Sequence, residues 1–432
     1  MSFSSLSLSQ PLLDAVREAG YQQPTPVQQK VIPLAINGED IIASAETGTG
    51  KTAAFALSLL HQLQQADIGD SPRQLKVLVM TPTRELAIQI QQCFEQYGQF
   101  LPYVSLAIYG GASINPQRKT LARGVDVLIA TPGRLFDIMG QYQLDLADVC
   151  HLVIDEADRM LDLGFVKDIE KVKRLVAFEH QTMMFSATYS QAVETLAKTM
   201  LRNPQVINVK QQATAGRITQ QAYLLDKRRK AELLAECIGK YNWQQVMVFV
   251  STKESADFLL SELSLDGINA AVFHGDKTQG ARNRALEEFK TAKLRVLIAT
   301  DLAARGLDIA ALPRVINFEL PEDNEDYVHR IGRTGRAGLS GEAISFFSEQ
   351  EHAKLAEIEA LIEQKIEVVI PKGYEPGAPM PARYRELSAS KPKKTFKSHK
   401  TAKHNAAKKP RFGQDKQAKK PARQGKYAAK KG

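Results

Sequence analysis

The sequence predicts an α/β protein with two doubly wound parallel sheets, joined by a short linker and followed by a disordered basic tail. Short β-branched and apolar runs alternate with helical patterns, which is typical of parallel sheets covered by helices on both faces. The same alternation restarts after a polar stretch in the middle of the chain. A length of 432 residues also exceeds what one hydrophobic core usually serves, so at least two domains are expected.

The first sheet is predicted from five apolar runs, each of which ends in a polar cluster and precedes a helical pattern. In parallel sheets of this kind, ligands bind at the carboxyl ends of the strands. The polar clusters fall at those ends, so we expect functional residues there. The runs are 40–44, 76–81, 125–131, 151–155 and 182–188.

The second sheet is predicted after the polar stretch VKQQATAGRITQQ at 209–221, which is typical of a linker. The pentapeptide VLIAT occurs at 127–131 and again at 296–300, each time before a basic loop. The repeat suggests that the two halves are related, although common strand residues could produce it by chance. The apolar runs of the second half are 245–252, 270–276, 295–301, 314–320 and 342–348.

The positive charge of the chain is concentrated at its C-terminal end. The formal net charge is +9. Residues 391–432 contain 16 Lys or Arg and one acid, Asp415, so the rest of the chain is net negative. Because this segment has no apolar periodicity, we expect it to be disordered and solvated.

Composition excludes several classes of protein. Hydrophobic residues make up 44% and charged residues 24%, an ordinary mixture for a soluble globular protein. No apolar run approaches the length of a membrane span, and the N-terminus shows no secretory signal. Cys93, Cys150 and Cys237 are far apart, which argues against a disulfide framework or a zinc site. We expect reduced cysteines and a cytoplasmic protein that binds no membrane.

The segment AETGTGKT follows a predicted strand and opens a predicted helix. In that context glycines let backbone N–H groups approach phosphates, Lys51 reaches the β and γ oxygens, and the Thr52 hydroxyl binds Mg²⁺. The general pattern begins with Gly, and Ala45 stands in its place. The candidate nucleotide-binding residues of this loop are Ala45, Glu46, Thr47, Gly48, Thr49, Gly50, Lys51 and Thr52.

Three neighbouring carboxylates lie at the end of the run 151–155 and just after it. Like charges repel, so Asp155, Glu156 and Asp158 indicate a positive partner. Asp155 is placed to hold Mg²⁺ through water, and Glu156 to orient or deprotonate the water that attacks the phosphate. Taken alone, these acids could belong to a solvated helix N-terminus. With the glycine-rich loop upstream, they predict an Mg²⁺-dependent ATPase.

These motifs, in this order, resemble those of the DEAD-box RNA helicases, most of all the bacterial RhlE-type subgroup. The resemblance covers about residues 1–375 and includes GYQQPTPVQ, PTREL, TPGR, DEAD, SAT and HRIGRTGR. It implies two RecA-like domains, ATP and Mg²⁺ as cofactors, and RNA as a partner. The implied regions are a Q-motif region at 1–29, an N-terminal domain at 30–208, a linker at 209–218, a C-terminal domain at 219–372, and a turn-rich linker with the basic tail at 373–432.

The resemblance also assigns roles at the nucleotide. Gln28 would pair with the adenine edge, because its carboxamide offers both a donor and an acceptor. Tyr21 would be the stacking ring and Phe3 a separate upstream aromatic residue of the site. Asp308 would contact the ribose. The alternative is that PTPVQ is merely a helix start, with its Pro and Thr as the capping residues.

Arg333 and Arg336 would reach the γ-phosphate from the second domain. They are three residues apart, so one helical turn would align their guanidinium groups. An arginine supplied to a phosphoryl transition state is worth about 10³–10⁵ in rate. Because the other two predicted catalytic residues, Lys51 and Glu156, belong to the first domain, we expect hydrolysis to require closure of the two domains.

Three strand ends share a Thr followed by an Arg, and these groups suit contacts to a sugar–phosphate backbone. Individually, the residues could be helix caps or surface ion pairs. Together they predict one RNA track, which Ser186, Thr188 and Asp158 would couple to the nucleotide. The candidate RNA-binding residues are Pro82, Thr83, Arg84, Gly111, Thr131, Arg134, Arg282 and Thr300.

ATP and RNA are expected to clamp the two domains together and to separate a few base pairs locally. We expect the Lys-rich tail to tether RNA, with a solvated extension that binds nothing as the alternative. A non-enzymatic RNA-binding or annealing protein and a DNA translocase with similar twin domains remain alternatives. Proteins of ribosome assembly or RNA decay are compatible partners.

Overall fold

The chain was described from a computed structural model. Met1–Met380 form one compact unit, which contains all the described residues. Predictions for the tail at 391–432, for Glu46 and Thr47, and for Asp308 and Arg336 lie outside them. The described residues are 2–45, 48–66, 73–142, 144–209, 218–304, 307, 309, 312–335, 340–375 and 377–379.

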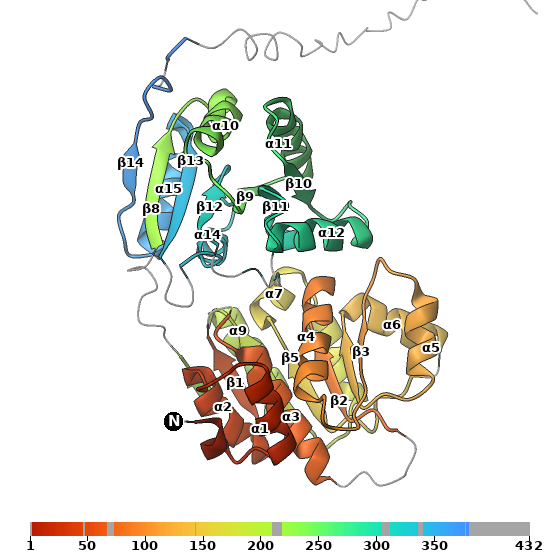
Figure 1. Ribbon diagram of the computed structural model, residues 1–432. Helices are drawn as coiled ribbons and strands as arrows, with labels where there is room; N and C mark the ends of the chain where they lie inside the picture. The colour runs from red at the N-terminus through yellow and green to blue at the C-terminus, as the bar shows by residue number, and fades with distance from the viewer. Residues whose placement is uncertain are drawn as a thin grey trace, which may run out of the picture. The chain divides into compact units, whose positions relative to one another are not determined.

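The first sheet is parallel throughout and contains β1 (Ile41–Ser44), β2 (Val77–Met80), β3 (Ser105–Ile108), β4 (Val127–Ala130), β5 (His151–Ile154), β6 (Gln181–Ser186) and β7 (Gln205–Asn208). Its spatial order is β3-β4-β2-β5-β6-β1-β7 (Figure 1). Five of these strands confirm the predicted apolar runs. The two that the sequence did not predict, β3 and β7, lie at the edges, and β7 exposes three of its four residues. An edge strand of this kind carries little apolar signal.

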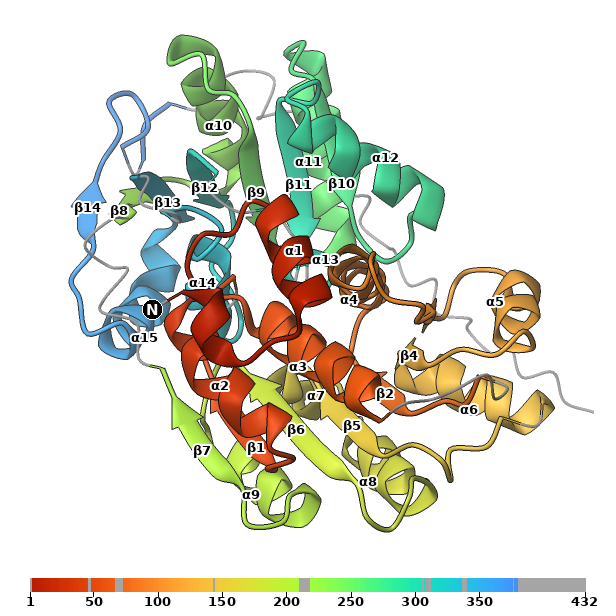
Figure 2. The ribbon, with the colours of Figure 1, turned by 60° about the horizontal axis from the view of Figure 1, so that its bottom comes forward.

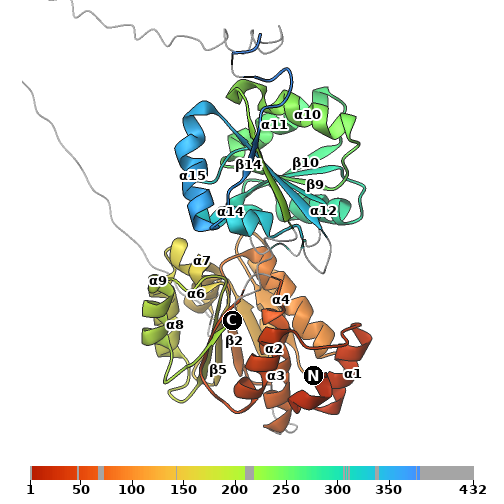
Figure 3. The ribbon, with the colours of Figure 1, turned by 90° about the vertical axis from the view of Figure 1, so that its left-hand side faces the viewer.

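Helices cover both faces of the first sheet. They are η1 (Phe3–Leu6), α1 (Gln10–Glu18), α2 (Pro26–Ile36), α3 (Lys51–Gln65), α4 (Arg84–Tyr97), α5 (Ile114–Leu121), α6 (Pro132–Gln141), α7 (Ala157–Asp162), α8 (Val166–Leu175) and α9 (Gln191–Met200). Val77 and Val79 of β2 pack in the core cluster of α1–α4, whereas Leu78 and Met80 pack in the cluster of α6–α9. Figures 2 and 3 show α1–α3 and α8–α9 on opposite sides of the strands. Burial of alternate residues on both sides confirms a doubly wound sheet.

The second sheet repeats the first. Its parallel strands are β8 (Ile218–Leu224), β9 (Val246–Val250), β10 (Ala270–Phe273), β11 (Val296–Thr300), β12 (Arg314–Asn317), β13 (Gly341–Phe347) and β14 (Glu367–Val369). Their order, β10-β11-β9-β12-β13-β8-β14, is the order of the first sheet when the strands of each sheet are numbered separately. The repeated VLIAT lies on β4 with the residue after it, and on β11, which are equivalent strands. The shared topology supports the relatedness that the repeat suggested.

Helices also flank the second sheet: η3 (Lys227–Arg229), α10 (Lys230–Lys240), α11 (Lys253–Leu265), α12 (Gln279–Lys290), α13 (Asp301–Ala304), α14 (Asn324–Ile331), η4 (Glu349–Glu351) and α15 (His352–Leu361). Val246 and Val248 of β9 pack in one core cluster, and Met247 and Phe249 pack in another. Both faces of this sheet are therefore buried as well. In the described part of the chain, no helix has the length and apolar character that a membrane crossing needs.

The prediction of a linker over 209–221 is wrong at its C-terminal end, because β8 begins at Ile218. The strand was missed because four of its residues are polar or amphipathic, so it contains no continuous apolar run. Its residues alternate between buried and more exposed positions. Gln220 is buried and its Oε1 accepts a hydrogen bond from the Tyr327 hydroxyl at 2.8 Å, so a polar residue serves as a core residue here. The exact domain boundaries stay predictions.

Candidate active site

The predicted nucleotide-binding motifs follow three strands that are neighbours in the first sheet. The glycine-rich loop follows β1, the acids follow β5, and SAT begins at the last residue of β6. The sheet order places β5, β6 and β1 side by side. Parallel strands bring their carboxyl ends to one edge, which is where such sheets bind ligands. Motifs more than 100 positions apart in the sequence are thus brought together at one edge.

Lys51 is held across the phosphate loop. It is the first residue of α3 and is only 7% exposed. Its Nζ donates to the backbone carbonyls of Ala45 and Ser186, the latter at 3.2 Å. The amine therefore lies between the ends of β1 and β6, where it can meet phosphate oxygens that approach the loop.

Gln28 connects the Q-motif region to the phosphate loop. Its Oε1 accepts from the Thr25 backbone N–H at 2.9 Å, and Thr25 Oγ1 accepts from the Gln28 N–H. Thr25 therefore caps α2 as predicted, and Gln28 completes a capping box with it. Its Nε2 also donates to the Gly50 carbonyl at 3.2 Å. The second N–H of the amide and the second lone pair of Oε1 can still serve an adenine edge.

The two predicted aromatic residues lie in different surroundings. Tyr21 is 51% exposed, with its ring centroid 6.3 Å from that of Tyr97. A ring with that exposure has a face open to a base. Phe3, in contrast, is 6% exposed and packs with Leu6 and Leu12 in the core. Its contribution to the site is to fix the segment before α1.

The acids after β5 are buried. Asp155 is 3% exposed, and its Oδ1 accepts the Glu156 N–H at 3.0 Å. Burial raises the pKa of Asp155 to about 7, the neighbouring Glu156 adds to the rise, and Lys51 opposes it. Burial also raises the pKa of Glu156, again with help from a neighbouring acid, Asp158. Both carboxyls would be stabilised as anions by a cation.

Glu156 has two features that favour a functional role. Its backbone is left-handed, with φ of 51°, which is uncommon for residues other than glycine. Its Oε2 is buried and makes no hydrogen bond with the described residues. A buried oxygen without a donor fits a water molecule or a hydrated cation.

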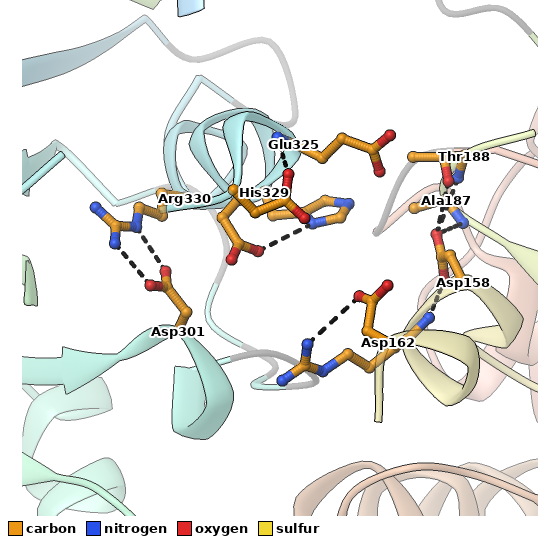
Figure 4. A network of polar contacts seen from close by, with 11 residues as sticks. Asp158, Asp162, Ala187, Thr188, Asp301, Glu325, His329 and Arg330 are labelled. Atoms are coloured by element: carbon orange, nitrogen blue, oxygen red, sulfur yellow. Dashed lines mark hydrogen bonds and ion pairs between the residues drawn. The ribbon is translucent and has the colours of Figure 1, made fainter. Parts of the chain in front are cut away.

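Asp158 joins the acidic motif to SAT. It accepts hydrogen bonds from the N–H groups of Ala187 at 2.9 Å and Thr188 at 3.0 Å, and from the Thr188 hydroxyl at 3.3 Å (Figure 4). Burial alone would raise the pKa of Asp158, but Lys51, His329 and the Thr188 N–H outweigh it, and the pKa is lowered. Ser186, at the end of β6, is fully buried next to this network.

Residues of α14 and the turn after it complete the site. Glu325, His329 and Arg333 line a small cavity together with Glu156, Asp158 and other residues that follow β5 and β6. Arg333 is 4% exposed, its Nη1 donates to the Leu307 carbonyl at 2.5 Å, and its charge opposes the rise in the pKa of Glu156 that burial causes. One predicted arginine is therefore near the predicted catalytic acid.

The prediction that one helical turn aligns Arg333 and Arg336 is wrong. α14 ends at Ile331, and Gly332 is its C-cap. Glycine is a poor helix former, so the chain leaves the helix before Arg333. Gly335 follows with φ of 67°, which no helix contains. Arg333 therefore lies on the turn after α14.

The candidate RNA-binding residues of the first sheet gather at the ends of β2, β3 and β4, which are adjacent. Thr83 caps α4, and its hydroxyl accepts the Leu86 N–H at 3.3 Å. Arg84 lies directly against Gly111: a Cβ on that glycine would be 2.1 Å from Arg84 Nη1. Pro82 precedes this cap. Thr131 occupies the N-cap position of α6 after β4, but its side chain makes no capping hydrogen bond. A capping role in addition to any RNA contact is thus present for Thr83.

Arg134 braces the loop after β3. It is 9% exposed, its Nη2 donates to the Ala112 carbonyl at 2.9 Å, and its Nη1 donates to Gln117 Oε1 at 3.0 Å. It therefore holds the loop that contains Gly111, which is a structural role beside the predicted one.

Arg282 and Thr300 are buried in the second half of the chain. Thr300 ends β11 and is 8% exposed. Arg282 forms an ion pair with Glu85 at 3.0 Å, and its guanidinium lies 4.5 Å from the Phe273 ring centroid. Gln279 Nε2 donates to the same Glu85 oxygen at 3.0 Å. Neither Glu85 nor Gln279 was predicted, although Glu85 stands inside PTREL and Gln279 is on α12 with the predicted Arg282.

Arg330 is a further residue that sequence reasoning missed. It is 1% exposed, and its Nε and Nη2 bind the two Asp301 oxygens at 2.6 Å each (Figure 4). Its Nη1 also donates to the Glu319 carbonyl at 2.6 Å. The fork fastens α14 to α13, and so positions the turn with Arg333. Its place within HRIGR was a signal, but its burial depends on partners distant in sequence.

The acids fit a magnesium ion held mainly through water. Among the described residues, no group of three or more His, Cys, Asp or Glu side chains is arranged as a metal cage. Mg²⁺ usually binds through one or two protein groups and keeps several waters. Asp155, with its raised pKa, and Thr52, at the start of α3, match that requirement.

Comparison with known proteins identifies the family. A model described as DEAD/DEAH box helicase matches residues 25–196, and one described as helicase conserved C-terminal domain matches 229–338. The ATP-dependent RNA helicase DeaD of Buchnera aphidicola subsp. Baizongia pistaciae is 40% identical over 374 residues, 86% of this chain and 61% of that protein. The DEAD-box ATP-dependent RNA helicase CshA of Bacillus subtilis is 39% identical over 368 residues, 85% of this chain and 74% of that protein.

Solved structures show the same fold. S. cerevisiae Dbp5 bound to RNA and ADP BeF3 has a TM-score of 0.75 at 29% identity, covering 90% of this chain and 99% of Dbp5. Mss116p bound to ssRNA and AMP-PNP has a TM-score of 0.76 at 27% identity, covering 86% of this chain and 80% of Mss116p. The RhlE-type subgroup stays a prediction. With its motifs, its two RecA-like domains and its relatives in agreement, the chain belongs to the DEAD-box family of ATP-dependent RNA helicases.

Proposed function

We propose that this chain hydrolyses ATP in an RNA-stimulated manner and locally unwinds RNA duplexes or remodels RNA–protein complexes. The convergence of Lys51, Glu156 and Arg333 carries the proposal. These residues supply a phosphate-binding amine, a buried carboxylate and a guanidinium, which together match phosphoryl transfer to water.

At the nucleotide, Lys51 would neutralise phosphate charge and Gln28 would select adenine. Asp155 and Thr52 would hold Mg²⁺, which supplies neutralisation of the charge that develops on the phosphates. Glu156 would orient the attacking water through its unbonded Oε2. Arg333 would stabilise the transition state, and Arg336 and Asp308 are proposed to assist it and to bind the ribose.

Asp158 is proposed as the link between hydrolysis and RNA. Its three hydrogen bonds to Ala187 and Thr188 make the acidic motif and SAT one rigid unit. A displacement of either motif would therefore displace the other. The RNA would be held through its backbone at the strand ends, and opening one base-pair step would cost about 1.4 kcal/mol by the DNA stacking average.

The basic tail is proposed to tether RNA without sequence preference, because each neutralised phosphate adds to a salt-dependent affinity. Proteins of ribosome assembly or RNA decay are proposed partners. A cytoplasmic location is also proposed, and the three cysteines, all free thiols, support it.

ATPase assays on the wild type and Glu156→Gln, with single-stranded RNA, single-stranded DNA or neither, test the function. We expect RNA to stimulate the wild type strongly and Glu156→Gln to lose at least about a hundredfold in rate while still binding ATP. Stimulation by DNA alone would favour a translocase. A wild type that is inactive under all conditions would favour an RNA-annealing protein.

A further inference from the structure

Two aromatic rings and two cations meet at the amino ends of the strands of the second sheet. Tyr241 is the C-cap of α10, and Trp243 precedes β9. Their ring centroids are 5.8 Å apart with planes at 22°, a stacked arrangement. Arg314 lies 4.9 Å from the Trp243 ring and Lys240 Nζ lies 5.4 Å from the Tyr241 ring. We call these four residues the Tyr241 stack.

The two rings differ in exposure. Trp243 is 4% exposed and belongs to a core cluster, whereas Tyr241 is 58% exposed. Trp243 therefore anchors the stack in the core, and Tyr241 presents an aromatic surface to solvent. Core packing explains the first ring but leaves the second unexplained.

The segment beneath the stack is held rigidly. Arg295 Nε donates to the Trp243 carbonyl at 2.6 Å, and its Nη2 donates to the Ile238 carbonyl at 2.8 Å and to Asn242 Oδ1 at 3.0 Å. These bonds fix the turn between the two rings. A fixed aromatic surface loses little entropy when a flat ligand stacks on it.

The charges around the stack are mainly positive. Arg314 is paired with Glu342 at 2.6 Å, so these two charges cancel. Arg295 hydrogen-bonds backbone carbonyls and an amide, so it retains its positive charge, and Lys240 adds another. Glu236, on the same helix as Lys240, keeps its negative charge, because its partner at 2.8 Å is the neutral Tyr374 hydroxyl. An anion beside Tyr241 therefore meets two cations against one acid.

The last described residues run along the same helix. Tyr374 packs in the core cluster that contains Trp243, and its hydroxyl binds Glu236 of α10. The Lys-rich segment 391–432 follows it in the sequence. The contact of Tyr374 with Glu236 places the end of the described chain beside α10, whose C-cap is Tyr241.

We propose that the Tyr241 stack is an accessory binding site for single-stranded RNA, in which one unpaired base stacks on Tyr241 and Lys240 contacts an adjacent phosphate. Exposed aromatic rings beside cations bind single strands in this way, without reading sequence. The site is at the amino ends of the strands, whereas the candidate RNA-binding residues described above are at the carboxyl ends, so it is a separate surface. The Tyr241 stack would bind a segment of RNA that flanks the segment held at the carboxyl ends of the strands.

The test compares full-length wild type, Tyr241→Ala, Tyr241→Phe and Phe100→Ala. Phe100 is 52% exposed and provides a matched loss of an exposed ring. Fluorescence anisotropy would measure the affinity for an oligouridylate and for an abasic ribose-phosphate oligomer of the same length. Trp243 is the single tryptophan of the chain, so its emission reports directly on the stack.

We expect Tyr241→Ala to weaken oligouridylate binding at least about fivefold and to leave abasic binding unchanged. Tyr241→Phe and Phe100→Ala should behave as the wild type, and oligouridylate, but not the abasic oligomer, should alter Trp243 emission. RNA-stimulated ATPase at saturating RNA should survive in Tyr241→Ala, which separates this proposal from the catalytic one.

Three results would overturn the proposal. Equal affinities of wild type and Tyr241→Ala would show that the ring does not bind RNA. Equal losses for oligouridylate and the abasic oligomer would show a structural effect. Trp243 emission that responds to a proline-rich peptide but not to oligouridylate would assign the surface to a protein partner.

Discussion

Glu156 combines a strained backbone with an unsatisfied side-chain oxygen, and few positions in a protein have both. A left-handed conformation costs a residue with a Cβ about 1–2 kcal/mol. Such strain is retained where surrounding contacts fix it, and it concentrates at functional sites. Here the Asp155 carboxylate holds the Glu156 N–H and Asp158 is fixed by SAT. The carboxylate of Glu156 is thereby aimed before any substrate arrives.

Asp155 should make the stability of the free protein depend on pH. Its pKa is raised to about 7 in the folded state, whereas an unfolded Asp ionises near its ordinary pKa of about 3.9, so the stability that the protonated carboxyl gives is present below pH 4 and is lost progressively as the pH rises to 7. Without nucleotide or Mg²⁺, Asp155→Asn should raise the apparent Tm at pH 8 by about 2–4 °C and change it little at about pH 4.

Thermal unfolding followed by circular dichroism at about pH 4, 5.5, 7 and 8 would measure this, and most of the change should fall between pH 4 and 7. Asp148→Asn, which removes an exposed carboxylate, is the control and should show no such pH trend. If Asp155→Asn and wild type kept a constant difference in Tm, the carboxyl would not titrate in this range.

At the scale of elements, each motif works because a strand end meets a helix start, and Gly50 shows how close the fit is. Its φ is 91°, and an added Cβ would be 2.4 Å from Gln28 Nε2. Gly50→Ala should therefore displace the Gln28 amide from its capping box and weaken ATP binding about tenfold, as the loss of one or two hydrogen bonds implies.

Gly38→Ala is a matched control for this change. Gly38 has φ of 81°, but an added Cβ meets nothing within 4 Å, so both variants carry the backbone strain and only one has the clash. Calorimetric titration with a non-hydrolysable ATP analogue should show weaker binding for Gly50→Ala alone. Equal affinities of the two variants would mean that the link between Gln28 and the loop is unimportant.

Arg330 fastens α14, and a lysine in its place would keep the charge but lose the fork. Arg330→Lys should lower the free energy of unfolding of this half by about 2–3 kcal/mol, because the half-buried Asp301 loses a bidentate partner. It should also lower kcat at least about tenfold by misplacing Arg333, while ATP affinity stays near that of the wild type.

Urea unfolding and steady-state ATPase would measure both effects. Arg228→Lys is the control, since Arg228 is 56% exposed in its ion pair with Asp226, and such surface pairs contribute little. An Arg330→Lys protein that is less stable yet fully active would show that the Arg330–Asp301 pair stabilises the fold but does not position Arg333 for catalysis.

The sequence predicted elements where local signals agree and missed those that depend on distant partners. The buried central strands carry continuous apolar runs. The loop from Ala45 to Thr52 was predicted from the spacing of its residues. The edge strand β7 and the polar strand β8 carry no such pattern. Glu85 and Arg330 were missed because their roles come from ion pairs with residues on other elements, Arg282 and Asp301. The turn at Gly332 was missed because the spacing of the arginines alone suggested a helix.

At the scale of the molecule, charge is divided between residues 1–390, which are net negative, and the basic segment 391–432. Removing residues 391–432 should weaken RNA binding and reduce its salt dependence, because each lost phosphate contact removes about 0.7 from the slope of log affinity against log salt. Basal ATPase should not change, because the catalytic residues lie before the tail.

Anisotropy titrations of RNA between 50 and 300 mM salt, roughly the range over which such contacts respond, would measure the slope. The control is a chain whose tail is kept in length but has its Lys and Arg residues replaced by Gln. This variant should match the deletion. An unchanged slope would leave the tail without a role in RNA binding.

The identical strand order of the two sheets has a consequence for how the enzyme responds to dilution. β8 is the counterpart of β1, but it leads into Leu225, Asp226 and η3 rather than into a glycine-rich turn, so the second copy has no phosphate loop of its own. Many nucleotide-hydrolysing assemblies need a neighbouring subunit to complete a catalytic centre. A polypeptide that carries such a neighbour within itself would bind one nucleotide at a time, and its specific activity would not depend on the protein concentration.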